Sequence, residues 1–375
     1  MERMELPEAR QHHVLETLQM WKHALPDTRS AVLPPNTQHP NPLVIADSVV
    51  ASVFAPGAIC SLDKESGRLQ WVYRLDGYGG SCLSHAGGRI YAKSSRTVYC
   101  LDAASGHPYW QFSPRPTGRE TTYSFPTIHG DRVFFGDRAG VFHCLDARSG
   151  AQIWAQQVST GKNNQVNSTA AISSDLVVVG SNDAVVAAYD IQTGRGAWMQ
   201  STDGPCITEL LVQEEKIFAA TAASIYVLDG STGETHLKRN WQNMDVHSFT
   251  RCPASIVAVL KPTGARTSQP SSHSSSGPPQ IIAFSGSTEM FRVDAAEFIV
   301  GIRFDDDSGL IFESRLDGIG IIDPSTGHRL HNIYSQNDVV GYGLVDVDGG
   351  RIYAMDMDRN MYCLRCPTNQ VGVAA

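Results

Sequence analysis

Short runs of apolar and β-branched residues recur along almost the whole chain, separated by turns rich in Gly, Asp, Ser and Thr. Two examples are TVYCLD, which ends at Asp102, and AVVAAYD, which ends at Asp190. Short runs of this kind between turn residues are typical of β-strands. The pattern therefore predicts an all-β protein made of many short strands.

The turn after such a run has the sequence D-x-x-[ST]-G in six places, which begin at Asp63, Asp102, Asp146, Asp190, Asp229 and Asp323. The first five Asp residues are 39 or 44 residues apart, and the last spacing, 94 residues, equals two periods of 47. The Asp side chain can accept hydrogen bonds from the turn, and the Gly supplies the positive φ that closes a hairpin. A period in this range is typical of a propeller blade.

Tryptophan residues follow the same period. Each of four tryptophans lies four residues after a motif Gly: Trp71, Trp110, Trp154 and Trp198. Trp241 lies eight residues after Gly233, which we interpret as a four-residue insertion before the same structural position. We expect these indoles to pack between adjacent sheets, because periodic aromatic residues in a repeat usually belong to the core. The alternative is a stack of aromatic platforms for a ligand.

Each turn joins the apolar run before it to a second run after it. Two further apolar runs lie upstream, so each repeat has four strands. The predicted blades cover about residues 42–75, 78–112, 121–158, 165–200, 206–243, 246–293, 297–334 and 338–373. We therefore predict an all-β, eight-bladed β-propeller with four-stranded antiparallel blades. The fallback is seven blades, if residues 246–293 leave the ring without forming a blade. Within that blade, residues 262–280 are rich in Ser and Pro, and we expect them to form a flexible loop.

The N-terminal part contains the sixth tryptophan, Trp21, in the run MWKHAL. This run resembles the outer strand of a blade. We therefore expect a strand near residues 19–25 to complete the last blade and close the ring, which would hide open sheet edges. Residues 1–18 would then be an extension, and residues 19–375 a single propeller domain. A free helix at residues 8–24 is the competing interpretation.

The composition narrows the classes of function. The chain has 375 residues, 42% of them hydrophobic, and a net charge of −8. It can therefore form a packed core, and an acidic chain without basic clusters argues against nucleic-acid binding. No stretch is apolar enough for a membrane span or a secretory signal, and the eight cysteines are dispersed. We therefore expect a cytoplasmic protein with no membrane partner, and no sequence motif indicates a metal site.

The combination of an apolar strand, the D-x-x-[ST]-G turn and a following Trp resembles the repeat of pyrroloquinoline-quinone-type, or quinoprotein-like, propellers. That family includes quinone-dependent alcohol dehydrogenases and an outer-membrane-assembly lipoprotein, so the resemblance implies the fold over roughly residues 40–370 but not one function. The dehydrogenases hold their quinone with a disulfide between adjacent cysteines, a floor tryptophan and calcium ligands. This chain has no adjacent cysteines. We therefore expect no quinone and no other cofactor.

The starts of the first strands are expected to line the central channel of a propeller. These positions differ from blade to blade, whereas the turns and tryptophans repeat, so they are the candidates for function. The acid, base and anion-binding candidates are Glu209, His247, Tyr123 and Arg303, and the other ligand-binding candidates are His39, Asn41, Asn167, Tyr342 and Asp338. The alternative is a solvated channel whose polar lining has no further role.

Two hypotheses for function follow. The first is a binding module whose channel takes a small molecule or peptide, or a protein partner. The second is a cofactor-independent lyase, cyclase or isomerase in small-molecule biosynthesis. In that enzyme Glu209 and His247 would act as acid and base, while Arg303 or Tyr123 fixes an anion or carbonyl. A quinone-dependent oxidoreductase is the third and least supported hypothesis.

Overall fold

The computed structural model describes residues 11–25, 42–53, 57–77, 79–94, 96–114, 124–206, 209–263, 277–297, 299–334, 344–356 and 360–367. Over these ranges the chain forms β-strands and one four-residue helix, α1 (Leu15–Leu18). No helix in these ranges is long and apolar enough to cross a membrane.

The strands form eight sheets, and six of them contain four consecutive strands in chain order. In the other two, an N-terminal strand lies at the edge: β1 beside β27–β30, and β2 beside β31–β33. The fold is an eight-bladed β-propeller with four-stranded antiparallel blades, as predicted, and the seven-bladed alternative is wrong. The blades belong to two units: unit 1 comprises Met1–Val53, Cys60–Val72 and His247–Ala375, and unit 2 comprises Phe54–Ile59 and Tyr73–Val246.

Unit 2 contains blades 2 to 5. Blade 2 is β7 (Gly79–Ala86), β8 (Arg89–Ser94), β9 (Val98–Asp102) and β10 (Pro108–Phe112); blade 3 is β11 (Thr127–His129), β12 (Arg132–Gly136), β13 (Val141–Asp146) and β14 (Gln152–Gln157). Blade 4 is β15 (Ala171–Ser173), β16 (Leu176–Ser181), β17 (Val185–Asp190) and β18 (Gly196–Ser201); blade 5 is β19 (Leu211–Gln213), β20 (Lys216–Ala220), β21 (Ser224–Asp229) and β22 (Thr235–Asn240).

Unit 1 contains blades 6 to 8 and most of blade 1. Blade 6 is β23 (Met244–Cys252), β24 (Ser255–Pro262), β25 (Gln280–Ser285) and β26 (Thr288–Asp294); blade 7 is β27 (Ile299–Asp305), β28 (Leu310–Arg315), β29 (Gly318–Ile322) and β30 (Arg329–Tyr334). Blade 8 has β31 (Asp346–Asp348), β32 (Arg351–Met355) and β33 (Asn360–Arg365), and blade 1 is β3 (Leu43–Ile45), β4 (Ser48–Val53), β5 (Ala58–Asp63) and β6 (Leu69–Arg74).

The repeated turn folds as the sequence indicates. In blade 3, the Asp146 carboxylate accepts hydrogen bonds from the backbone N–H of Ser149 at 2.7 Å and from its hydroxyl at 2.6 Å. The N–H of Gly150 donates to the carbonyl oxygen of Asp146 at 2.8 Å, and Gly150 has φ of +73°. These contacts use the Asp, the Ser and the Gly of the motif, so the motif determines the local structure of the turn.

The tryptophans join neighbouring blades. The indole N–H of Trp110 donates to the carbonyl oxygen of Ala147 in the turn of blade 3, and that of Trp154 donates to Ile191 in the turn of blade 4, both at 3.1 Å. Each ring also covers the motif Gly of the turn that it contacts: a Cβ atom on Gly150 would lie 2.6 Å from the Trp110 ring. The prediction that the indoles pack between sheets is confirmed for Trp110, Trp154 and Trp198, the last of which donates to the carbonyl oxygen of Gly230 at 3.1 Å.

The assignment of Trp241 to the same position is wrong. Strand β22 has no insertion, and Leu237 lies opposite Val227, just as Trp154 lies opposite Cys144 in blade 3. Trp241 follows the end of β22. The spacing from Gly233 to Leu237 is the regular one, so a different side chain occupies the position in this blade.

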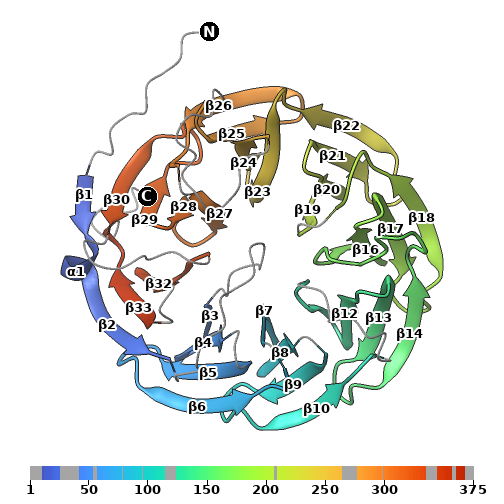
Figure 1. The fold of residues 1–375 in the computed structure, drawn as a ribbon, viewed down its shortest axis with the longest axis horizontal. Helices are drawn as coiled ribbons and strands as arrows, with labels where there is room; N and C mark the ends of the chain where they lie inside the picture. Colours follow the sequence, from blue (N-terminus) through green and yellow to red (C-terminus); the bar gives the residue numbers. More distant parts are fainter. Residues whose placement is uncertain are drawn as a thin grey trace. The chain divides into compact units, whose positions relative to one another are not determined.

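The N-terminal segment completes blade 8 and extends blade 7. Strand β2 (Gln19–Ala24) pairs with β33 in antiparallel orientation, as predicted, and the indole of Trp21 donates to the carbonyl oxygen of Lys64 at 3.0 Å. Before it, β1 (Gln11–Val14) pairs with β30 in parallel orientation, although it belongs to the predicted extension. Figure 1 shows both pairings between the N-terminal and C-terminal parts of the chain. Leu15, in α1 between the two strands, is 1% exposed and packs in the core of blades 7 and 8.

Blade 6 keeps its predicted strands although it lacks the motif. Strand β24 ends at Pro262 and β25 begins at Gln280, so the predicted flexible loop falls between them. Residues 264–276 of that loop lie outside the described residues.

Candidate functional site

The first strands of blades 6, 7 and 8 in unit 1 carry two of the predicted site residues, His247 on β23 and Arg303 on β27. We call Arg303, His247 and the carboxylate Asp346 on β31 the β27 site. Side chains at these strands connect one blade to the next, so the site is built from contacts between blades.

An ion pair between blades 7 and 8 is the centre of the β27 site. A guanidinium nitrogen of Arg303 lies 2.8 Å from Oδ1 of Asp346. The other carboxylate oxygen of Asp346 accepts a hydrogen bond from the backbone N–H of Val44, in blade 1, at 2.8 Å. Burial raises the pKa of Asp346, and the Arg303 charge acts against this shift. One carboxylate therefore connects three consecutive blades and holds the arginine.

The two partners of this pair differ in exposure. The side chain of Asp346 is 7% exposed, whereas that of Arg303 is 42% exposed. Within the described ranges, Asp346 is the one ion-pair or hydrogen-bond partner of Arg303. A guanidinium carries five N–H donors in a planar fork, which suits a carboxylate or phosphate. The arginine is thus fixed by one buried contact and presents further donors to solvent.

His247 connects blade 6 to strand β27 of blade 7. Its Nε2 lies 2.9 Å from the carbonyl oxygen of Val300 on β27, and a carbonyl only accepts, so Nε2 carries a hydrogen. Three residues farther along β23, the Thr250 hydroxyl accepts from the N–H of Phe304 at 3.2 Å. The Nε2 atom of His247 is therefore a donor in a contact between blades, which is a structural use of this nitrogen.

The remaining predicted residues are placed as follows. Glu209 is exposed and belongs to unit 2, whereas His247 belongs to unit 1, so the proposed acid and base lie in different units. Tyr123, His39, Asn41, Tyr342 and Asp338 lie outside the described residues. In unit 1, Arg303 lies on β27 and His247 contacts β27 from β23. The structure adds Asp346, which was not among the predicted site residues.

Asn167, in unit 2, lies before β15 in a cluster of amides. Its Nδ2 donates to the side-chain oxygen of Asn182 at 3.1 Å and to that of Gln165 at 3.4 Å. Its Oδ1 is buried without a hydrogen-bond partner among the described residues. The side chain thus has one acceptor that those residues leave unused.

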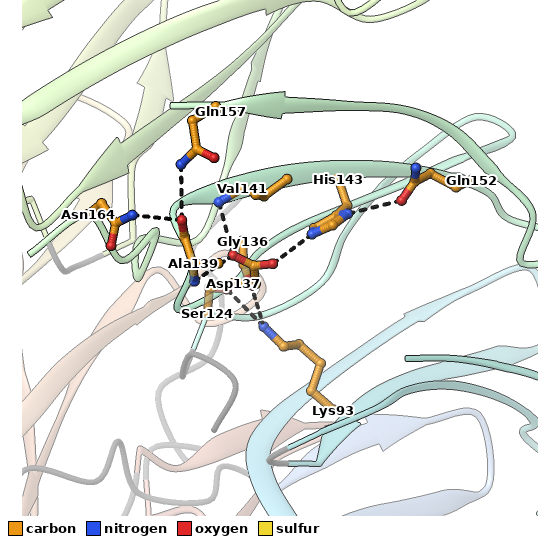
Figure 2. A network of polar contacts seen from close by, with 10 residues as sticks. All are labelled: Lys93, Ser124, Gly136, Asp137, Ala139, Val141, His143, Gln152, Gln157 and Asn164. Atoms are coloured by element: carbon orange, nitrogen blue, oxygen red, sulfur yellow. Dashed lines mark hydrogen bonds and ion pairs between the residues drawn. The ribbon is translucent and has the colours of Figure 1, made fainter. Parts of the chain in front are cut away.

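Unit 2 also contains a buried polar network that the sequence analysis missed (Figure 2). Lys93, at the end of β8, is 1% exposed. Its ammonium donates to the Ser124 hydroxyl at 3.2 Å and to the carbonyl oxygen of Gly136 at 3.1 Å, and it lies 5.4 Å from the centre of the Phe135 ring. Comparison of the repeats could have identified Lys93. The equivalent residues in blades 3 to 5 are the small residues Gly136, Gly180 and Ala220, so a lysine departs from the pattern.

The other part of this network recurs in other blades and is structural. The Asp137 carboxylate accepts from the backbone N–H groups of Ala139 and Val141 and lies 2.9 Å from Nε2 of His143. Burial alone would raise the pKa of Asp137, but the hydrogen bonds from His143 and Val141 outweigh it and lower the pKa. The equivalent contact in blade 8 joins the Tyr362 hydroxyl to the Asp356 carboxylate at 2.7 Å. In blade 2 the Tyr99 hydroxyl donates to the Asp76 carboxylate, and in blade 5 the Tyr226 hydroxyl accepts from the backbone N–H of Asp203. We therefore assign the Asp137–His143 pair to folding.

Among the described residues, no cluster of three or more His, Cys, Asp or Glu side chains could hold a metal ion. The described thiols are buried, for example Cys363, and burial raises the pKa of Cys363 to about 11. A thiol of this kind is protonated at neutral pH and acts as a small core residue.

Comparison with solved structures supports the fold. BamB from Moraxella catarrhalis is similar with a TM-score of 0.68 and 17% identity over 92% of this chain and 99% of that chain. The computationally designed protein Ika8 gives a TM-score of 0.71 with 16% identity over 88% of this chain and 96% of that chain. Quinohemoprotein alcohol dehydrogenase from Comamonas testosteroni gives 0.71 with 13% identity over 93% of this chain and 76% of that chain.

Sequence comparison identifies the family. No curated protein matches the chain. The family model described as outer membrane protein assembly factor BamB matches residues 18–181 and 138–258, which together cover more than half of the chain. The repeated turns, the indoles between blades and this match agree, and the chain belongs to the BamB family of quinoprotein-like β-propellers.

Proposed function

We propose that this propeller is a binding module that recognises an acidic segment of a protein partner at the β27 site. The observation that carries the proposal is the unequal exposure of one ion pair: buried Asp346 holds Arg303, and the guanidinium is 42% exposed. The carboxylates of a peptide are the groups that such a guanidinium binds best.

The fixed position of Arg303 favours binding. A free arginine side chain loses about 2 kcal/mol of rotamer entropy when it is immobilised. In this protein the contact with Asp346, at 2.8 Å, already restricts the side chain before any ligand arrives. A ligand carboxylate therefore meets a donor group that is already oriented, which is the usual basis of preorganised recognition.

A protein partner also agrees with the family, whose description names an assembly factor. We further propose that binding needs no quinone, because the chain has no adjacent cysteines and the indoles of Trp110, Trp154 and Trp198 are bound to neighbouring turns. The cytoplasmic location expected from the dispersed cysteines is part of the same proposal.

The test is a binding titration with a fluorescent peptide rich in Glu and Asp, compared with a peptide in which Gln and Asn replace them. We expect the wild-type protein to prefer the acidic peptide and Arg303→Gln to weaken its binding by at least tenfold, because a charge-assisted hydrogen bond is lost. The matched control is Arg292→Gln, since Arg292 is 37% exposed and also lies 2.8 Å from a carboxylate, that of Glu289.

The control variant should bind the acidic peptide as the wild type does, and thermal melting should show that both variants fold. Equal binding of the two peptides by the wild type would contradict the proposal. Unchanged binding of the acidic peptide by Arg303→Gln would contradict it as well.

A further inference from the structure

Lys261, at the end of β24 in unit 1, lies in an unusual environment for a lysine. Its Nζ donates to the carbonyl oxygen of Ile299 on β27 at 2.7 Å, and this is its one polar contact within the described ranges. No carboxylate in those ranges forms an ion pair with Lys261, and residues 264–276, which follow it in the sequence, contain no Asp or Glu. The amine is thus placed against a neutral acceptor.

Two other lysines of the protein, Lys64 and Lys238, have acidic partners. Lys64 lies 2.8 Å from Asp348, and Lys238 lies 3.0 Å from Asp203. A carboxylate at that distance favours the charged ammonium, whereas burial without one disfavours it. The two residues before Lys261 in β24, Val259 and Leu260, are apolar and 0% exposed, and Ile299, which supplies the carbonyl oxygen, is 1% exposed.

The consequence is an amine that is partly neutral near physiological pH. Burial lowers the pKa of Lys261 to about 8, from the ordinary value of 10.5. A neutral amine that donates one N–H to Ile299 keeps its lone pair directed away from that carbonyl. The Lys261 residue as a whole is half-buried.

We propose that Lys261 is a nucleophilic site for small aldehydes and ketones, with which it forms an imine. The nitrogen lone pair forms a bond to the carbonyl carbon while the carbonyl electron pair moves to oxygen, which takes a proton. The carbinolamine then loses water, the C=N bond forms, and the proton lost from nitrogen returns to solvent. This inference does not depend on recognition of acidic peptides at Arg303.

The experiment traps the imine in the full-length protein. The protein is treated with limiting acetaldehyde and cyanoborohydride at pH 7.5, and peptide mapping by mass spectrometry measures the rate of reductive alkylation at each lysine. The internal control is Lys162, which is exposed in a loop. At this pH a lysine with the ordinary pKa is about 0.1% neutral, whereas an amine with a pKa near 8 is about one quarter neutral. We therefore expect Lys261 to react roughly 100-fold faster than an ordinary lysine.

The pH profile gives a second readout on the unaltered protein. The labelling rate of Lys261 should level off above about pH 8, whereas the rate at a lysine with the ordinary pKa of 10.5 keeps rising toward pH 10. In the variant Lys261→Arg the fast phase should disappear while the labelling of Lys162 is unchanged. Equal labelling rates of the two lysines, or parallel pH profiles, would overturn the proposal.

Discussion

At the scale of single residues, repetition distinguishes folding from function. The motif Asp, Ser or Thr, and Gly repeat because each takes part in the same turn, as Asp146, Ser149 and Gly150 do in blade 3. Residues that depart from the repeat are of two kinds. Lys93 is buried in contacts within unit 2, whereas the side chain of Arg303 is 42% exposed.

The packing of an indole on the motif Gly gives a prediction at this scale. In Gly150→Ala the new methyl group would meet the Trp110 ring at 2.6 Å, and φ is +73°. The matched control is Gly130→Ala, where φ is +57° and no atom lies within 4 Å of the new Cβ. Both variants carry the strain of a left-handed alanine, about 1–2 kcal/mol.

We expect Gly150→Ala to lose about 1–3 kcal/mol more in the free energy of unfolding than Gly130→Ala, because only Gly150→Ala overpacks the contact between blades. Urea unfolding of the two variants measures this difference. Equal losses in the two variants would show that the indole contact has no role beyond the turn conformation.

At the scale of secondary-structure elements, the N-terminal strands show how blades 7 and 8 are stabilised. Strand β1 lies against β30, and Nε2 of His13 lies 3.1 Å from Nδ1 of His331. Burial lowers the pKa of both imidazoles, and the charge of His12 lowers that of His13 further, while His13 lowers that of His331. The folded state therefore prefers both rings neutral.

This pair predicts a loss of stability in acid. Because the folded pKa values lie below the unfolded value of 6.5, the contribution of the pair is fully present above pH 6.5. It is lost as the pH falls below 6.5, where the unfolded state binds protons more readily. We expect the melting temperature to fall between pH 7.5 and 5.5, and to fall less in His331→Asn than in the wild type.

A control for other titrating groups is His236→Asn, because His236 is 48% exposed on β22 and remote in sequence from β1. This variant should keep the wild-type dependence on pH. If His331→Asn also keeps the full dependence, the contact between β1 and β30 is not sensitive to protonation.

At the scale of the whole molecule, the repeat made the fold predictable and left the site mostly unpredicted. Eight blades and the role of β2 followed from spacing, since six of the eight blades carry the same turn motif at a regular period. The exception, Trp241, shows that spacing alone cannot identify which side chain fills a repeated position, because Leu237 fills it without an insertion.

The site could not be read from the sequence in the same way, because its contacts join separate blades. Arg303 was selected as an anion-binding residue, but its partner Asp346 follows it by 43 positions and belongs to the next blade. A single acidic residue in one blade has no repeated counterpart that would mark it. The same holds for Glu313 in β28, which is 0% exposed and accepts hydrogen bonds from Arg329.

The most direct test of the central claim is a double-mutant cycle between Arg303 and Asp346, with affinity for the acidic peptide as the readout. If Asp346 acts by holding Arg303, Asp346→Asn should weaken binding when Arg303 is present and have no effect in the Arg303→Gln background. The predicted coupling energy is about 0.5–3 kcal/mol. Equal effects of Asp346→Asn in both backgrounds would contradict the account.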